Sequence, residues 1–345
     1  MLEVKHPLYQ EDLSMTGPYI KAMVNGKDNV SILVIGATGL IGSFLVDALL
    51  NYNDKVVDCI TVYAMGRSME RLKKRFAYSS SDRLVLVQHD IQSSLDESYE
   101  YDYIFHLASN ADPGSYALYP VETISTNILG SMNVIEYAKV HKSTKVVFTS
   151  TMEVYGEIEK DKLSEEDYGK INYNQIRAGY PESKRTSELL YRSAVKQYGV
   201  NAVIARLGYI YGPTMTDSDN KVVAEFIRNA VNKQDIVLKS EGKQRRTYCY
   251  VADTVNGLFV LADKGENGEA YNVADKNSKI TIKELAELIA KESRVQLYQD
   301  ISYVQKNVKV FHTVLCTDKI EKLGCKTRVS IINGINRTID IYKTE

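Results

Sequence analysis

Residues 31–42 read Ser-Ile-Leu-Val-Ile-Gly-Ala-Thr-Gly-Leu-Ile-Gly, and this stretch decides the fold. Its first five residues form a short apolar run, which is typical of a buried parallel strand. Glycines and then an apolar pattern at helical spacing follow. A strand, a glycine turn and a helix in this order are typical of a loop that binds a dinucleotide pyrophosphate at a helix N-terminus. The alternative is a glycine-rich turn without a ligand. The predicted cofactor contacts in this loop are Gly36, Thr38, Gly39, Leu40, Ile41 and Gly42.

Apolar runs and amphipathic stretches alternate from residue 31 to residue 207. Further runs suited to parallel strands span residues 59–64, 84–87, 103–107, 145–150 and 202–207. Helical patterns lie between them, for example over 127–140 and 183–198. Alternation of this kind predicts an α/β fold with a Rossmann-type doubly wound parallel sheet. From Thr214 onward the alternation loosens, which indicates a smaller C-terminal lobe that binds the substrate.

The same pattern predicts the domain organisation. Residues 1–28 are polar and aperiodic, and we expect an N-terminal arm or short helix there. Residues 29–205 form the dinucleotide-binding domain, to which residues 245–275 return. Residues 206–244 and 276–345 form the substrate-binding lobe.

The composition bounds the partners and the compartment. The chain has 345 residues with a formal net charge of -1, so anionic ligands must be met by local sites and a nucleic-acid surface is not expected. The longest apolar stretch is interrupted by glycines and polar residues, so no membrane contact is expected. The N-terminus has no apolar signal core, and four scattered cysteines show no paired spacing. We therefore expect a cytoplasmic protein without a metal site.

The choice between NAD and NADP stays open from the sequence. The second strand is expected to end on an acidic residue that binds the adenosine ribose of NAD, but Gly66 and Arg67 stand there. Arg67 is suited to stacking on adenine or to binding a 2′-phosphate; the alternative is a solvated arginine. After the third strand, Asp90 and Ile91 are further candidates for the adenine end, with a helix cap as the alternative for Asp90.

Tyr180-Pro-Glu-Ser-Lys184 places a phenol and an ammonium one helical turn apart. A phenol is a poor base at neutral pH, because its reference pKa is about 10. An adjacent ammonium and a cationic nicotinamide ring lower that pKa. Tyr180 is therefore a candidate general base for a hydroxyl proton while hydride leaves the same carbon. Since Tyr-x-x-x-Lys is common by chance, the inference depends on its place after the glycine loop and after the strand that ends at residues 149–151.

With these motifs in order, the chain resembles the extended short-chain dehydrogenase/reductases of the nucleotide-sugar epimerase/dehydratase family over roughly residues 30 to 342. The remaining matching segments are His106–Ser109, Ser150–Gly156, Arg206–Pro213 and Arg246–Asp253. Within the family, the chain most resembles UDP-glucuronate decarboxylases, in segments such as 106–113 and 179–185. This resemblance implies bound NAD or NADP, a UDP-sugar substrate, and a homodimer formed through the helices near 120–140 and 180–198.

The resemblance also implies residue roles. It places Leu107, Ala108 and Ser109 under the nicotinamide, together with Tyr180 and Lys184. The catalytic residues it implies are Thr151, Glu153, Tyr180 and Lys184. The substrate contacts it implies are Ser109, Thr151, Tyr209, Val222 and Arg246. For Arg246 this means the nucleotide diphosphate, with Arg206 as a weaker candidate; the alternative is a structural arginine paired with Asp253 or Glu241.

Two positions depart from the family pattern. Met152 stands where decarboxylases or dehydratases carry Ser or Asp, and a thioether has no proton to donate to a leaving hydroxyl. Tyr209 replaces the Asn that usually touches the substrate. These departures put the usual dehydratase route and the identity of the sugar in question.

The retained groups are suited to oxidising a sugar at C4 to a 4-ketone. From that intermediate, decarboxylation or other C5 chemistry, 4,6-dehydration and C4 epimerisation are all open, and Glu153 favours C5 chemistry modestly. An alternative of another class is a catalytically silent NAD(P)-binding regulator. For three further features a structural role is preferred over a functional one. Cys249 is expected to be a small buried residue, His106 a hydrogen-bonded core residue, and residues 73–75 a solvated helix face.

Overall fold

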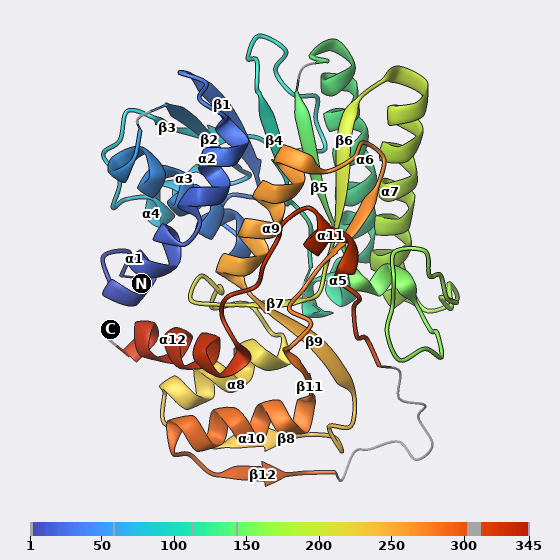
Figure 1. Cartoon of the computed structure of the whole chain (residues 1–345). Helices are drawn as coiled ribbons and strands as arrows, with labels where there is room; N and C mark the ends of the chain where they lie inside the picture. Colours follow the sequence, from blue (N-terminus) through green and yellow to red (C-terminus); the bar gives the residue numbers. More distant parts are fainter. Residues whose placement is uncertain (1–2, 58, 112, 143, 302–311, 344–345) are drawn as a thin grey trace.

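A computed structural model describes residues 3–57, 59–111, 113–142, 144–301 and 312–343. Its main feature is a seven-stranded sheet in the order β10-β6-β5-β4-β1-β2-β3 (Figure 1). All neighbouring strands in it pair parallel. The strands are β1 (Val30–Ile35), β2 (Ile60–Gly66), β3 (Leu84–Gln88), β4 (Tyr103–His106), β5 (Lys145–Thr151), β6 (Asn201–Leu207) and β10 (Ala270–Val273). The predicted doubly wound α/β fold is confirmed.

Alternate side chains of the strands enter two separate cores. On β1, Ile32 and Val34 pack into one hydrophobic cluster, whereas Leu33 and Ile35 pack into the other. Successive residues of a strand point to opposite faces, so a strand covered on both sides is apolar along its whole length. This explains why β1 has no alternating polar positions at its centre.

Helices cover both faces of the large sheet (Figure 1). The first face carries α3 (Leu40–Lys55), α4 (Met69–Arg75) and α9 (Val251–Lys264). The second carries α6 (Pro120–Val140) and α7 (Gly179–Tyr198), which pack against each other and supply residues such as Tyr191 to the second core. The α6 helix begins before the predicted residue 127, because Pro120 is tolerated in a first turn.

The smaller lobe is built from late segments. A three-stranded sheet has the order β11-β9-β7, and a two-stranded sheet pairs β12 with β8. The elements are β7 (Tyr209–Tyr211), α8 (Val222–Val231), β8 (Ile236–Leu238), β9 (Arg245–Tyr250), β11 (Lys279–Thr281), α10 (Ile282–Ser293), β12 (Leu297–Gln299), α11 (Asp318–Lys322) and α12 (Ile331–Lys343). Within residues 245–275, α9 and β10 join the large sheet, whereas β9 belongs to the small one.

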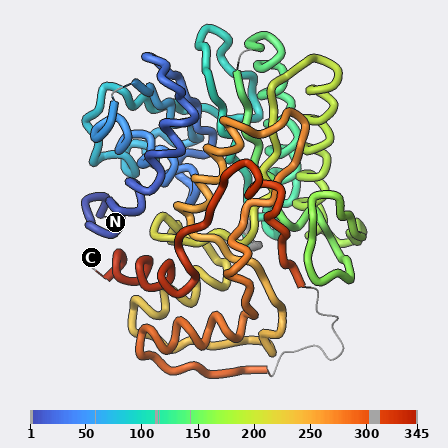
Figure 2. The backbone as a smooth tube through the Cα atoms, viewed as in Figure 1, coloured from blue at the N-terminus to red at the C-terminus, as the bar shows by residue number. Residues whose placement is uncertain are grey.

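The N-terminal segment forms two helices, α1 (Pro7–Ser14) and α2 (Gly17–Val24), which pack on α3 and α9. The buried carboxylate of Asp12 accepts hydrogen bonds from the Tyr250 hydroxyl (2.6 Å) and from Arg337 Nε (2.8 Å). Arg337 belongs to α12, so the first and last helices lie side by side (Figure 2). The segment is therefore part of the folded body.

One surface prediction is wrong. Lys73 and Lys74 on α4 are exposed, as expected of a solvated face, but Arg75 contacts the buried carboxylate of Asp47 on α3. The hydroxyl of Tyr9 also donates to Asp47. A cluster of basic residues in the sequence does not reveal that one of them faces a buried acid from another helix. Separately, none of the helices in the described ranges is long and apolar enough to cross a membrane.

Candidate active site

A cleft opens where the strand order reverses, at the carboxyl ends of β1 and β4. A cavity of about 200 Å³ lies in it. Its lining includes eight of the predicted cofactor-binding residues, namely Gly36, Thr38, Gly39, Arg67, Ile91, Leu107, Ala108 and Ser109. They come from the glycine turn and from the segments that follow β2, β3 and β4. The fold thus brings together residues that are up to 73 positions apart, from 36 to 109.

The glycine turn fits a dinucleotide because side chains are excluded from it. Gly36 has a φ of +90°, and a Cβ there would lie 3.0 Å from the Ala108 backbone. A Cβ on Gly42 would lie 2.3 Å from the Gly36 carbonyl oxygen. Gly39 caps α3 without a side-chain hydrogen bond, so the amides of the first turn face the cleft without a competing oxygen. Such a helix N-terminus favours an anionic pyrophosphate.

The remaining predicted cofactor residues lie beside this cavity and do not line it. Leu40, Ile41 and Gly42 form the first turn of α3. Asp90 is exposed, and its Oδ1 accepts a hydrogen bond from the Gln92 amide at 3.0 Å within a turn. Residues 91–100 contain no helix, so the helix-cap alternative for Asp90 is wrong. Arg67 is exposed at the end of β2 and lines the cavity, so its position agrees with a contact to the adenosine end.

Six other residues line the cavity and were not predicted as cofactor contacts, namely Ile35, Met65, Gly66, His89, Asn110 and Thr126. The first four lie at the carboxyl ends of β1, β2 and β3. The rule that ligands bind outside the carboxyl ends of parallel strands would have found these positions. Thr126 lies on α6, and its buried hydroxyl has no hydrogen-bond partner among the residues described. No local signal marks it, because only the docking of α6 brings it to the cleft.

The predicted catalytic pair lies at the start of α7. Tyr180 and Lys184 are one turn apart and almost fully buried, as the spacing predicts. Lys184 Nζ donates a hydrogen bond to the Thr149 carbonyl oxygen at 2.8 Å and lies 4.8 Å from the ring centroid of Phe148. Burial lowers the pKa of Lys184 to about 7, against a smaller opposing effect of Glu188. The amine is therefore anchored to β5 and is easily deprotonated.

Burial raises the pKa of Tyr180, and the charge of Glu153 raises it further. A hydrogen bond with Thr151 acts in the opposite direction. The Tyr180 ring also stacks on Tyr116, with centroids 5.0 Å apart and planes at 11°. The sequence predicted a lowered pKa from Lys184 together with a cationic nicotinamide. In the protein chain alone, the groups around the phenol favour its neutral form.

Thr151 ends β5, and Met152 and Glu153 begin the 3-10 helix η1 (Met152–Tyr155). The Thr151 hydroxyl accepts a hydrogen bond from the Glu153 amide at 3.2 Å. Met152 is buried in a small apolar cluster with Leu163, Leu315 and other residues. This packing accounts for the apolar residue at a position where the family pattern has Ser or Asp. Thr151 forms a hydrogen bond with Tyr180, and the charge of Glu153 acts on the same phenol. Thr151, Glu153 and Tyr180 therefore share one buried site.

The Glu153 carboxylate faces two arginines. Arg177 Nη2 lies 3.4 Å from Glu153 Oε2. Burial raises the pKa of Glu153, whereas Arg177 and then Arg246 lower it. Arg246 stacks on Tyr209 at 4.2 Å from the ring centroid and donates two hydrogen bonds to Gln244 Oε1.

The alternative partners of Arg246 are engaged elsewhere. The Asp253 carboxylate accepts hydrogen bonds from the backbone amides of Arg328 and Val329. Glu241 pairs with Lys243 at 2.8 Å. Neither alternative partner therefore pairs with Arg246, whose charge lowers the pKa of Glu153, and its contact with a substrate stays a prediction.

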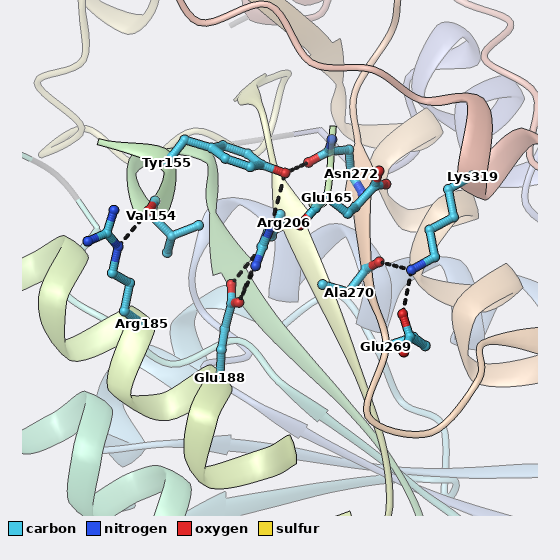
Figure 3. Close-up of polar contacts among 10 residues, drawn as sticks. All are labelled: Val154, Tyr155, Glu165, Arg185, Glu188, Arg206, Glu269, Ala270, Asn272 and Lys319. Atoms are coloured by element: carbon cyan, nitrogen blue, oxygen red, sulfur yellow. Dashed lines mark hydrogen bonds and ion pairs between the residues drawn. The ribbon is translucent and has the colours of Figure 1, made fainter. Parts of the chain in front are cut away.

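Arg206 is a structural residue, which corrects its assignment as a weaker phosphate candidate. Its guanidinium forms an ion pair with Glu188 of α7 at 2.7 Å and donates to the Tyr155 hydroxyl at 3.2 Å (Figure 3). Tyr155 in turn donates to Asn272 of β10 at 2.7 Å. Both charges are buried and mutually satisfied, so none is left for a ligand. The figure also shows Lys319 bonded to Glu269 and to the Ala270 carbonyl.

The predicted structural roles of His106 and Cys249 are confirmed. His106 is buried, and its Nδ1 shares a hydrogen bond with the Tyr191 hydroxyl at 2.8 Å. Burial lowers the pKa of His106 to about 3, with a smaller effect of Lys184, so it is neutral at physiological pH. Cys249 is buried in the main hydrophobic cluster.

Comparison with known proteins identifies the family. Residues 32–274 match the NAD dependent epimerase/dehydratase family. The chain belongs to this family. Its members that are similar to this chain include UDP-glucuronic acid decarboxylase 6 of Arabidopsis thaliana, which is 36% identical over 263 residues, or 76% of this chain and 74% of the relative. The family is NAD-dependent, and this chain is an enzyme of it.

Solved structures of the family superpose on most of the chain. UDP-N-acetylglucosamine 4-epimerase from Methanobrevibacter ruminantium M1, in complex with UDP-N-acetylmuramic acid, has a TM-score of 0.77 at 25% identity, covering 92% of this chain and 99% of that one. DesIV, a dTDP-glucose 4,6-dehydratase from Streptomyces venezuelae with NAD and TYD bound, has a TM-score of 0.75 at 25% identity, covering 92% and 98%. Both are similar in fold, and they carry out different reactions.

The buried amine makes a stability prediction. Because the folded-state pKa of Lys184, about 7, lies below the ordinary value of 10.5, folding is opposed by the charged form below pH 7. This penalty disappears as the pH rises toward 10.5, since the amine is then neutral in both states. Compared with Lys184→Met, the wild type should therefore gain stability between pH 7 and pH 10, as measured by thermal melting. Lys196→Met, on the exposed side of the same helix, is the control. A difference that stays constant over this range contradicts the prediction.

Proposed function

We propose that this enzyme oxidises a UDP-sugar at C4 with bound NAD and then decarboxylates the 4-keto intermediate at C5, as a UDP-glucuronate decarboxylase does. The observation that carries the proposal is the convergence of Thr151, Glu153 and Tyr180 in one buried site beside the glycine cleft. The names of the similar relatives supply the sugar nucleotide, since the first matches are UDP-glucuronic acid decarboxylases.

The chain's own residues handle the proton. The Tyr180 phenolate takes the proton of the C4 hydroxyl, and the Thr151 hydroxyl holds the same oxygen by a hydrogen bond. Lys184, anchored on the Thr149 carbonyl, accepts or returns a proton readily because its pKa is about 7. Bound NAD supplies the hydride acceptor and a positive charge that favours the phenolate. A 4-ketone makes a C5 carboxylate a β-keto acid, and loss of CO2 from it leaves an enolate. The enolate takes a proton at C5, and the ketone is then reduced back to the C4 alcohol while Tyr180 returns the proton to its oxygen.

The environment of Glu153 favours C5 chemistry over the two alternatives. A 4,6-dehydratase needs a proton donor for the leaving hydroxyl, and Met152 offers none at that position. A plain C4 epimerase needs no carboxylate flanked by two arginines beside the sugar. The presence of every catalytic group in one site also disfavours a silent regulator.

Arg246 is proposed to bind the phosphate nearest the sugar, and Tyr209, Val222 and Ser109 to line the rest of the substrate site. The Arg246 guanidinium lies over the ring of Tyr209, and this contact positions it for the proposed role. Val222 begins α8 of the smaller lobe, and Ser109 lies between the cleft and Asn127 of α6.

A homodimer through α6 and α7 is also proposed. Both helices expose large apolar side chains on their outer sides, which a partner would cover. These residues are Val121, Ile124, Leu129, Met132 and Leu189.

The reaction is tested by incubating the NAD-loaded enzyme with UDP-glucuronate and analysing products by mass spectrometry. We expect a UDP-pentose and CO2, without lasting accumulation of NADH. Tyr180→Phe should keep cofactor binding and lose turnover by about 10²–10⁴-fold, because the general base is gone. Tyr168→Phe, at an exposed tyrosine, is the control. Near-wild-type turnover of Tyr180→Phe contradicts the proposed role of Tyr180 as the general base. If UDP-glucuronate is not consumed but neutral UDP-hexoses are interconverted, the enzyme is a C4 epimerase instead.

Arg67 is expected to govern tolerance of NADP. If its guanidinium meets the 2′-phosphate, Arg67→Ala should weaken NADP binding by about 1.5–3 kcal/mol and NAD binding much less. Titration of both cofactors into the two proteins measures the difference. Arg71→Ala, at an exposed arginine four residues further along on α4, is the matched control. If the binding of both cofactors is weakened equally, or is not weakened, Arg67 is a solvated surface residue without a role in cofactor choice.

The phosphate role of Arg246 gives a graded expectation. A guanidinium makes paired bonds to phosphate oxygens that an ammonium cannot make. Arg246→Lys should therefore raise the Michaelis constant, Arg246→Ala should raise it further, and both should weaken binding of free UDP. Arg245→Ala, next to it on β9 and exposed, is the control. A lower melting temperature with unchanged UDP affinity shows a structural arginine instead.

A further inference from the structure

Arg177 contacts the carboxylate of Glu153 from the solvent side of the site. It lies on the 3-10 helix η2 (Ile176–Ala178), just before α7. Its Nη2 is 3.4 Å from Glu153 Oε2 and donates to the Tyr116 hydroxyl at 3.4 Å, while 66% of the side chain is exposed. The Glu153 side chain is only 23% exposed. A charge at the mouth of the site thus contacts a carboxylate inside it.

Arg177 is also linked to the general base. Its guanidinium lies over the Tyr116 ring at 5.9 Å from the centroid. That ring stacks on Tyr180 with planes at 11°. Any group bound between Arg177 and Glu153 therefore lies close to the phenol that removes the sugar proton.

The two arginines around Glu153 are held differently. Arg246 is fixed by two hydrogen bonds to Gln244 and by the Tyr209 ring. Both polar contacts of Arg177 measure 3.4 Å, longer than the roughly 2.7–2.9 Å of a strong charge-assisted bond. A loose, largely exposed ion pair is worth little and is easily exchanged. Arg177 is therefore the cation that can leave Glu153 at small cost.

Two cations act on Glu153. Arg177 faces it from η2 and Arg246 from β9, and the other titratable neighbours are the phenols of Tyr116, Tyr180 and Tyr209. With Arg246 on the substrate diphosphate, as proposed above, Arg177 is the cation that remains for Glu153. A carboxylate on the sugar competes with Glu153 for this charge, whereas a neutral hydroxymethyl group does not.

We propose that Arg177 is a specificity-determining residue that exchanges Glu153 for the carboxylate on C5 of a sugar acid, and so sets the preference for a uronate over a neutral hexose. The inference rests on the proposed function, because it assumes that the site takes a UDP-sugar. Once Arg177 has turned to the substrate, the pKa of Glu153 rises, since burial raises it and Arg177 is the largest opposing influence.

The test measures binding of UDP-glucuronate, UDP-glucose and UDP by calorimetry. The NAD-loaded Tyr180→Phe enzyme, in which turnover is blocked, carries in addition Arg177→Gln, Arg177→Lys or no further change. A charge-assisted bond of about 1.5–3 kcal/mol corresponds to at least tenfold in affinity. Arg177→Gln should weaken UDP-glucuronate binding by at least about tenfold and the other two ligands by less than about twofold. Arg177→Lys should fall between. Lys170→Gln removes an exposed charge from the same connection and should change nothing.

The outcomes separate the inference from the function on which it rests. Equal weakening for all three ligands, or no weakening, overturns the role of Arg177 while leaving the decarboxylase proposal intact. Failure of the parent enzyme to bind UDP-glucuronate at all overturns the proposed function, and this inference with it.

The pH profile offers a second readout in the otherwise unaltered enzyme. The acid limb of kcat/KM reports groups of the free enzyme. Because Arg177 lowers the pKa of Glu153, Arg177→Gln should move that limb to higher pH, and Arg177→Lys should largely restore it. An acid limb that does not move shows that Arg177 does not act on Glu153. The melting temperature should stay unchanged, because the side chain is mostly exposed.

Discussion

The parallel pairing of the large sheet is the constraint on which the rest of the structure depends. With all seven strands parallel, every strand delivers its last residue to the same edge. Since β1 lies between β2 and β4, the connections on its two sides run to opposite faces and leave a crevice at its end. Ile35 of β1 and Thr151 of β5 therefore arrive at one edge, although 116 residues separate them (from 35 to 151). Cofactor cleft and proton-transfer site are neighbours because of the topology, before any side chain is considered.

A second interaction fixes the helix that carries the base. Glu188 on α7 and Arg206 on β6 are both buried and pair at 2.7 Å. Removing one partner of such a pair leaves an uncompensated charge, which typically costs about 3–5 kcal/mol. The pair joins α7 to the sheet one turn after Lys184, and Tyr155 extends it to Asn272 (Figure 3). The position of Tyr180 relative to Thr151 therefore depends on a polar network beneath the site as well as on apolar packing.

The sequence was informative where the chemistry is local and misleading where it depends on docking. The glycine loop and the Tyr180–Lys184 spacing each lie within a few residues, so their placement could be predicted. Arg206 was misassigned because a motif shows that a charge exists and does not show which acid it faces. The stack of Tyr116 on Tyr180 could not be found, because it forms only when α5 (Pro113–Leu118) docks beside α7. A short helix was among the expectations for residues 1–28, but the docking of this segment into the folded body shows only in the buried contacts of residues such as Asp12.

The electrostatics of the site show why its chemistry is conditional on its ligands. Burial acts in the same sense on all three titratable groups, raising the pKa of Tyr180 and Glu153 and lowering that of Lys184. Each group is thereby shifted toward its neutral form, because a low-dielectric site disfavours charge of either sign. Near Glu153, the cations of the described chain that oppose this are Arg177 and Arg246, both of which are proposed to contact the substrate. In the proposed mechanism, the phenol becomes a base when positive charge enters with the cofactor, and the charge of Glu153 depends on where Arg177 points.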